Sequence, residues 1–192
     1  MSSELVQAVA AAFAVDGVLA RHEPGFSPRL AQDQMAERIA QAVHAAGGRF
    51  MDAPMTRTPK EAAEGRLNLL VGGDKALFDE CRPLLACFAE NISHAGAVGA
   101  GHRMKLLHNY VSLGFVALLS EAAACAQRSG LAPEVFVDIL AKGGGGGVAL
   151  ERVKPSLLSG DKSSLRFAMS NAQKDLGYYT TMAGDAGAVG VI

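Results

Sequence analysis

The stretch "GAGHRMKLLHNYVSLGFVALLSEAAACAQRSG", Gly99 to Gly130, decides the fold. It predicts one long helix from Val98 to Ser129, which Gly130 ends. The middle of this helix, "YVSLGFVALLSEAAACA", is apolar on nearly all sides. Such a helix must be buried on most of its sides, either in a core or against a partner chain.

Secondary-structure patterns differ on the two sides of Gly96. Before it, strands and helices alternate, which favours an α/β layer. The helices expected there span 3–17, 27–48 and 74–89, and the strands are "RFMDAP", "LNLLVGG" and "NISHAG". After it only helices are expected, with three more at 133–142, about 148–158 and about 167–183. The sequence therefore predicts two domains, an α/β domain over 1–96 and an all-α domain over 97–192.

Composition excludes several classes of protein. The 192 residues carry a net charge of −1 and no basic block, so nucleic acid is not an expected partner. The longest apolar run, "AVAAAFAV", is far shorter than the ~20 residues of a membrane span, and no signal peptide is expected. The three cysteines form no C-x-x-C pair, which favours reduced thiols and a cytoplasmic location. The histidines show no metal-ligand spacing, so no metal is expected.

Two glycine-rich stretches are similar to nucleotide-binding loops by letter. The opening stretch has Gly99 and Gly101 in place, but Met104 stands where a third glycine belongs. The run 143–147 follows an expected helix rather than a strand, so a flexible loop is the expectation there. The chain therefore has no convincing dinucleotide fingerprint of its own.

Lys105 and Asn109 lie four residues apart and share one face of the long helix, which His102 and Ser112 extend. A lysine and an amide beside an apolar run cost free energy unless they have partners. In the plainer interpretation Lys105 extends to water and Asn109 bonds a neighbouring loop. In the functional one, the ammonium polarises a carbonyl and protonates the alkoxide formed by reduction, while Asn109 orients the same oxygen or holds the lysine.

Two further stretches have a plain and a functional interpretation. In "DAPMTRTP", 52–59, Thr56, Arg57 and Thr58 follow the end of a strand, where ligands of α/β sheets bind. Arg57 is either a solvated surface side chain or a two-pronged contact for a carboxylate, phosphate or sulfonate. In "QKDLGYY", Lys174 and Asp175 form either a solvated charged pair or part of a site.

Together, "DAPMTRTPKEAAEGRLNLLVGGD", "VGAGHRMKLLHN" and "KDLG" resemble the β-hydroxyacid dehydrogenase family, which includes 3-hydroxyisobutyrate dehydrogenase and tartronate semialdehyde reductase. The resemblance runs from about Glu4 onward. It implies a Rossmann domain that binds NAD or NADP, followed by an all-α domain like that of 6-phosphogluconate dehydrogenase, entered through a long helix. It also implies pairing of copies through the helical domains, and an oxidoreductase that acts on small β-hydroxy acids and their semialdehydes.

The same resemblance implies roles for single residues. Lys105 falls on the catalytic lysine, Asn109 on a substrate-contacting asparagine, and Lys174 on a lysine near cofactor and substrate. The family's usual Ser-Gly-Gly is replaced by Thr56, Arg57 and Thr58. An Arg-Thr loop is similar to the sulfolactaldehyde reductase branch, which implies a strongly anionic substrate.

A second departure from the family pattern concerns the cofactor. The family's opening strand and its G-x-G-x-x-G loop have no counterpart in this sequence, and "PGFSP" skips a strand. The expectation is therefore a fragment that is truncated at both ends, with an internal deletion. Two hypotheses follow: the chain keeps the substrate half of a dehydrogenase, or it is an inactive remnant or pseudoenzyme that serves as a helical dimerisation module.

Overall fold

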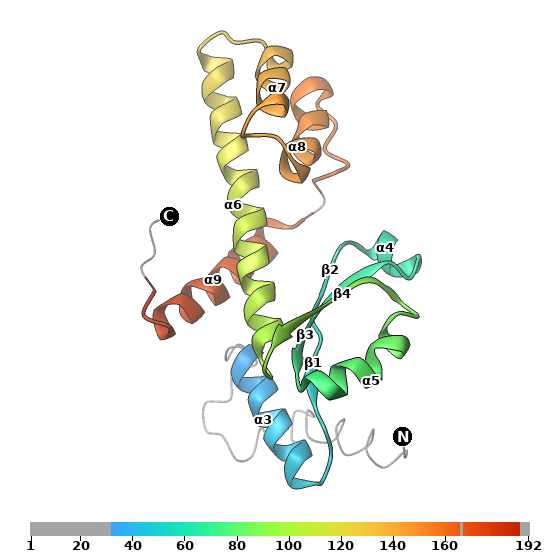
Figure 1. Ribbon diagram of the computed structural model, residues 1–192. Helices are drawn as coiled ribbons and strands as arrows, with labels where there is room; N and C mark the ends of the chain where they lie inside the picture. The colour runs from blue at the N-terminus through green and yellow to red at the C-terminus, as the bar shows by residue number, and fades with distance from the viewer. Residues whose placement is uncertain (1–31, 166, 189–192) are drawn as a thin grey trace.

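The computed structural model describes residues 32–165 and 167–188, so the expected helix at 3–17 lies outside the described residues. Helix α3 (Gln32–Ala45) leads into a small sheet, and a long helix, α6, extends from that sheet to the far end of the molecule (Figure 1). The start expected for α3 at Ser27 also lies outside the described residues. Its Ala40 is buried, and α3 contacts α6.

The sheet is mixed. Strands β1 (Met51–Asp52) and β2 (Met55–Thr56) both run antiparallel to β3 (Leu67–Gly73). β1 pairs with the C-terminal end of β3 and β2 with its N-terminal part, so together they form one edge of the sheet. Pro54 lies between them, and its carbonyl accepts a hydrogen bond of 3.0 Å from the amide of Leu70. Strand β4 (Ala89–Gly96) lies parallel to β3 on its other side. The strand expected to end at Pro54 therefore resumes after it.

The core of the α/β part lies between the sheet and α5 (Lys75–Leu85). Alternate residues of β3, Leu67, Leu69 and Val71, are buried there, as the period of two of a strand requires. They form one apolar cluster with residues of α5 that include Phe78. Asp74 caps α5 by accepting a 2.9 Å hydrogen bond from the amide of Leu77, so this helix begins where the sequence predicts. The short helix α4 (Pro59–Ala63), between β2 and β3, was not predicted.

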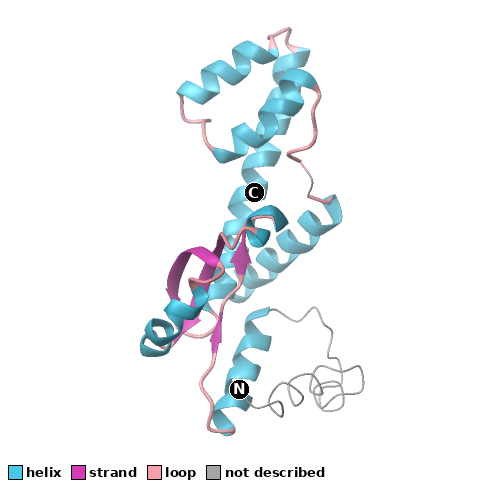
Figure 2. Cartoon of the chain, turned by 90° about the vertical axis from the view of Figure 1, so that its right-hand side faces the viewer, coloured by secondary structure: helices cyan, strands magenta, loops and turns pink. Residues whose placement is uncertain are grey.

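The second half of the chain is helical. Helix α6 (Ala100–Arg128) has 29 residues and packs with its first turns on β3 and β4. Its far end contacts α7 (Pro133–Lys142) and α8 (Val148–Ser159), and α9 (Met169–Asp185) returns to the near half (Figures 1 and 2). The predicted fold class is confirmed: a small α/β part is followed by helices, and a long helix joins them.

The described residues leave one side of α6 uncovered. Five large apolar side chains are 41–56% exposed at intervals of three and four residues: Met104, Leu107, Val111, Phe115 and Leu118. We call these five residues the α6 stripe. The described residues thus do not bury α6 on most of its sides, so of the two alternatives expected from the sequence, burial against a partner chain stays a prediction. By length and composition α6 is the one described helix that could cross a membrane, a test that core helices of soluble proteins also pass.

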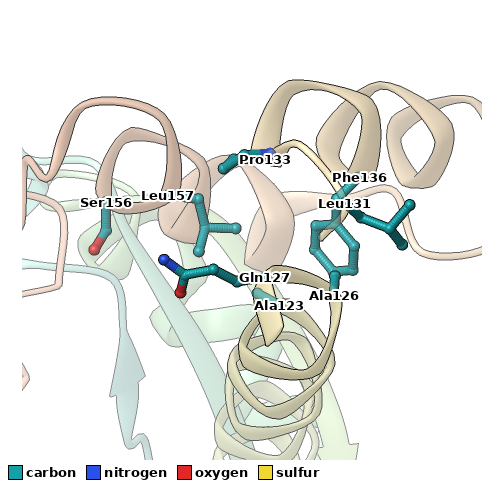
Figure 3. A pocket seen from close by; sticks show the side chains of 8 residues that line it. All are labelled: Ala123, Ala126, Gln127, Leu131, Pro133, Phe136, Ser156 and Leu157. Carbon is teal, nitrogen blue, oxygen red and sulfur yellow. The ribbon is translucent and has the colours of Figure 1, made fainter. Parts of the chain in front are cut away.

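A cavity of about 170 Å³ lies at the far end of α6, between that helix, α7 and α8 (Figure 3). Phe136 and Leu157 form part of its wall, and Gln127 and Ser156 supply polar atoms. Gln127 is 22 residues beyond Lys105, which is roughly 33 Å along a helix axis. The cavity is therefore remote from the candidate site.

Candidate active site

The first turn of α6 is held by a carboxylate from β1. The Asp52 side chain is 1% exposed, and Oδ1 accepts a 2.7 Å hydrogen bond from the amide of Gly99. Oδ2 accepts 2.9 Å bonds from the amide and from ring Nδ1 of His102. Burial acts to raise the pKa of Asp52, but the hydrogen bonds from His102 and Gly99 outweigh it and hold that pKa below its ordinary value. Asp52 is therefore a carboxylate, and His102 carries its proton on Nδ1.

Lys105 follows one turn later and is half-buried. Its pKa is lowered, mainly because burial disfavours the charged ammonium. The charge of Lys174 lowers this pKa further, whereas the carboxylate of Asp175 acts in the opposite direction. A lysine in such surroundings exchanges its proton more readily than a solvated lysine does, which is what acid–base chemistry requires.

Asn109 joins α6 to α9. Its Nδ2 donates a 2.9 Å hydrogen bond to Oδ2 of Asp175, whose side chain is only 14% exposed. The other carboxylate oxygen of Asp175 lies 3.2 Å from Nζ of Lys174, which is 53% exposed. The structure thus brings Lys105, Asn109, Lys174 and Asp175 together where α6 and α9 meet.

Aromatic stacking reinforces the same junction. The rings of Tyr110 on α6 and Tyr179 on α9 are stacked, with centroids 3.8 Å apart and planes at 10°. Each tyrosine lies within four residues of a polar partner in the Asn109–Asp175 bond. The stacked pair therefore fixes the two helices beside the polar groups, as expected for a site that must hold its geometry.

The residues predicted to bind the substrate acid lie at the end of β2 and in the turn that leads to α4. Thr56 is 6% exposed and pairs with Asn68 of β3. The Thr58 hydroxyl donates to Glu61, lowering the pKa of that carboxyl to about 2, and the Thr58 amide donates to the same side chain over 3.1 Å. Thr58 thus helps to begin α4 and is not unpartnered.

Arg57 has a backbone φ of 85° and is the one described non-glycine residue with a positive φ. A positive φ is strained for a residue with a side chain and is often retained for function. Its guanidinium bonds the carboxylate of Glu90 and the carbonyl of Arg66. Hydrogen bonds from Arg57 and Arg66 hold the pKa of Glu90 below its ordinary value.

The predicted residues thus fall into two groups, and no described contact joins them. Lys105, Asn109 and Lys174 gather at the junction of α6 and α9. Thr56, Arg57 and Thr58 lie instead at the end of β2 and in the turn that follows it. Sequence reasoning did not place Asp52 in the site. It named Asp175 only as half of a charged pair, with solvation as the plainer interpretation. Both carboxylates are shielded from solvent by elements that are distant in sequence. The residues next to them in the sequence therefore do not reveal their role.

Two family models match this chain in tandem. Residues 30–96 match the NAD-binding domain of 6-phosphogluconate dehydrogenase. Residues 99–191 match a domain described as the NAD-binding domain of NADP-dependent 3-hydroxyisobutyrate dehydrogenase.

Curated proteins and solved structures agree with these matches. The 2-(hydroxymethyl)glutarate dehydrogenase of Eubacterium barkeri is 33% identical over 73% of this chain and 46% of that protein. Glyoxylate/succinic semialdehyde reductase 1 of Arabidopsis thaliana is 33% identical over 72% of this chain and 48% of that protein. The structure of Mycobacterium tuberculosis 3-hydroxyisobutyrate dehydrogenase with L-serine aligns with a TM-score of 0.75 at 26% identity, over 82% of this chain and 56% of that one.

These matches, with the long entry helix and its polar first turns, define a chain with the two-part fold of the 3-hydroxyisobutyrate dehydrogenases. The chain belongs to the β-hydroxyacid dehydrogenase family. It spans about half the length of these curated relatives.

NAD or NADP is the cofactor that both matched domains imply. Rossmann domains hold its pyrophosphate on a glycine-rich turn between a strand and a helix N-terminus. Among the described residues, the turn from β4 into α6 has Gly99 and Gly101, but Asp52 already occupies that N-terminus. A pyrophosphate and a buried carboxylate cannot share these amides, so the turn from β4 into α6 does not fit this part of the cofactor.

Proposed function

We propose that this chain carries the substrate-binding part of an NAD(P)-dependent dehydrogenase that interconverts a small anionic hydroxy acid and its semialdehyde. The observation that supports this best is Lys105, a half-buried lysine with a lowered pKa. It lies next to an asparagine whose amide is fixed by a carboxylate. The family to which the chain belongs catalyses this class of reaction in its named members.

The proposed chemistry uses Lys105 as general acid and base. As the neutral amine, Nζ accepts the hydroxyl proton of the hydroxy acid while the carbonyl forms. In the reverse direction the ammonium returns that proton to the alkoxide oxygen. Asp175 uses one amide hydrogen of Asn109, which leaves a second hydrogen to bind the same substrate oxygen. The hydride acceptor is NAD(P), when bound.

The anionic end of the substrate is proposed to bind in the turn after β2, at Thr56, Arg57 and Thr58. Arg57 is held in a strained conformation, which supports a role beyond surface charge. Its guanidinium bonds Glu90, so an incoming anion must compete with that carboxylate. A sulfonate or phosphate competes better than a weakly charged group, because planar guanidinium binds such oxygens in two-pronged fashion. Lys174, exposed beside Asp175, is proposed to contact the cofactor.

Fluorescence titration of NADH and NADPH with the 192-residue chain tests this proposal. NADH or NADPH binding at micromolar concentration, followed by turnover of an anionic hydroxy acid, would support the dehydrogenase function for this chain. Absence of any fluorescence change would contradict cofactor binding by this chain and favour the second candidate function.

That second candidate is an inactive helical module that pairs with a copy of itself. The α6 stripe favours it, because five large apolar side chains on one helix are exposed in the single chain. Spacings of three and four residues are those of helix–helix seams. Pairing through this stripe is also compatible with the enzyme, so oligomeric state alone does not separate the candidates, whereas cofactor binding does.

A further inference from the structure

We propose that Asp52 is a positioning residue for the active-site face of α6: its buried carboxylate replaces a local helix cap and thereby sets the place of Lys105 and Asn109. The proposal rests on the proposed function only for the use made of Lys105. The contact itself, between β1 and a helix 47 residues later, stands independently of any reaction.

Helix α6 has no cap of its own. Its N-cap residue is Gly99, in the left-handed region at φ 87°, and glycine has no side chain to accept a hydrogen bond. No acidic residue stands in the first turn to complement the positive end of the helix dipole. The longest described helix therefore begins with orphan amides that must find a partner elsewhere in the chain.

Asp52 supplies both missing elements. Its Oδ2 binds the amide of His102, the third helical residue, which is the amide that a local cap side chain ordinarily binds. Its Oδ1 binds the amide of Gly99, and its negative charge lies against the positive end of the dipole. The ring of His102 donates the third bond to this carboxylate. Asp52 thus accepts three hydrogen bonds from the first turn of α6. These bonds fix the position of that turn along the helix axis and its rotation about the axis.

The backbone around this contact is packed too closely for a side chain at two glycines. A Cβ placed on Gly101 would lie 2.2 Å from the carbonyl oxygen of Leu70 and 2.6 Å from Oδ2 of Asp52. A Cβ placed on Gly72 would lie 2.4 Å from Oδ1 of Asp52 and 2.8 Å from the amide of Gly101. Glycine is thus needed at both positions because β3, the carboxylate and α6 approach so closely.

A rigid first turn determines where Lys105 lies. Each residue of a helix adds 1.5 Å and 100°, so a displacement at Gly99 is carried to Lys105, roughly 9 Å along the axis. Asp175 holds α6 a second time, through Asn109. The charged groups that act on Lys105 from α9 are Asp175 and Lys174. A change in the first turn alters the burial of Lys105 and its distance from both, and hence its proton affinity.

The test measures this proton affinity directly, without cofactor or substrate. Competitive labelling of the lysines over a range of pH, read by mass spectrometry, gives the midpoint at which Lys105 becomes reactive. Asp52→Asn keeps the size of the side chain but loses its charge and presents an N–H to a donor. We expect it to raise amide hydrogen exchange at 99–104 at least about tenfold and to move the Lys105 midpoint upwards by about half a unit or more.

Asp74→Ala is the matched control, because it removes the aspartate cap of α5 on the other face of the sheet. It should raise exchange at the start of α5 and leave the Lys105 midpoint unchanged. A midpoint that moves equally in both variants, or in neither, would overturn the proposal. Should Asp52→Asn fail to fold, His102→Ala removes the ring that donates the third hydrogen bond to this carboxylate and should shift the midpoint in the same direction by a smaller amount. An unchanged midpoint there would equally overturn it.

Failure of this proposal is distinguishable from failure of the proposed function. If Asp52→Asn shifts the Lys105 midpoint but the chain binds no NADH, the positioning role holds and the dehydrogenase proposal for this chain fails. If NADH binds and the midpoint does not shift, the reverse is true.

Discussion

The two halves of α6 differ in what holds them: the first half by hydrogen bonds of polar side chains, the second by apolar packing. Its first turns carry polar side chains with partners on other elements: Asp52 binds His102, and Asp175 binds Asn109. Its last turns pack against α7 and α8 through small and apolar residues such as Ala123 and Ala126. Hydrogen bonds in the first half fix the positions of particular side-chain atoms. Apolar packing in the second half stabilises the fold but is not directional.

Mutations in the two halves of α6 should therefore have different effects, on the chemistry of Lys105 or on the stability of the fold. A change in the first half should act on Lys105 at modest cost to folding. A change in the second half should cost folding and leave Lys105 as it is.

The largest expected effect is that of Lys105→Ala on turnover. Removal of a general acid and base should lower kcat by about 10²–10⁴-fold, with NADH affinity nearly intact. Lys142→Ala is the matched control, since that exposed lysine of α7 forms an ion pair with Asp138 of the same helix and lies in the second half of the chain. Steady-state kinetics of both variants measure the contrast. Equal turnover in the two would remove Lys105 from its proposed role.

Leu150→Ala should have the next largest effect, on stability. Leu150, on α8, is 1% exposed, and truncation of a fully buried leucine costs about 2–5 kcal/mol of unfolding free energy. Urea unfolding measures the loss. The Lys105 labelling midpoint of the folded variant should match that of the wild type. A shifted midpoint would mean that the two halves of α6 are coupled, and would contradict their separate roles.

Asp52 should give a smaller, pH-dependent effect. Its pKa is lower folded than unfolded, so its ionisation stabilises the fold above the unfolded pKa of about 3.9. That stabilisation is lost as the pH falls through the folded pKa. Urea unfolding between pH 2.5 and 6 should therefore show a wild-type advantage over Asp52→Asn that shrinks below about pH 4. Parallel curves across this range would show that Asp52 is not the titrating group.

The smallest expected effect on folding is that of Phe115→Glu in the α6 stripe. Phe115 is 56% exposed, so the unfolding free energy of the single chain should change by no more than about 0.5 kcal/mol. Pairing of copies through the α6 stripe should nevertheless be lost, which sedimentation equilibrium would show as a fall in mass. Glu121→Gln, exposed on the same helix outside the stripe, should leave the mass unchanged. Identical masses for the wild type and Phe115→Glu would exclude this face as the interface.

Much of the fold was predictable because its boundaries have local causes. Asp74 begins α5, Pro133 begins α7 and Gly130 follows the end of α6, each through its own backbone chemistry. The five-residue helix α4 was missed because so short a segment shows no helical period.

The candidate site was only partly predictable. The spacing of Lys105 and Asn109 places them on one helix face. The carboxylates that hold this face depend on how the elements pack, because Asp52 binds His102 across 50 residues of sequence and Asp175 binds Asn109 across 66. The engagement of Arg57 by Glu90 likewise arises from the approach of β4 to the turn after β2, which no local pattern reveals.

The most direct test of the central claim is the protonation of Lys105 in the unmodified chain. Competitive labelling over a range of pH compares its midpoint with those of exposed lysines such as Lys142. We expect a lower midpoint for Lys105, because burial disfavours its ammonium. A midpoint equal to or above that of the exposed lysines would contradict the claim that α6 presents a lysine prepared for acid–base chemistry.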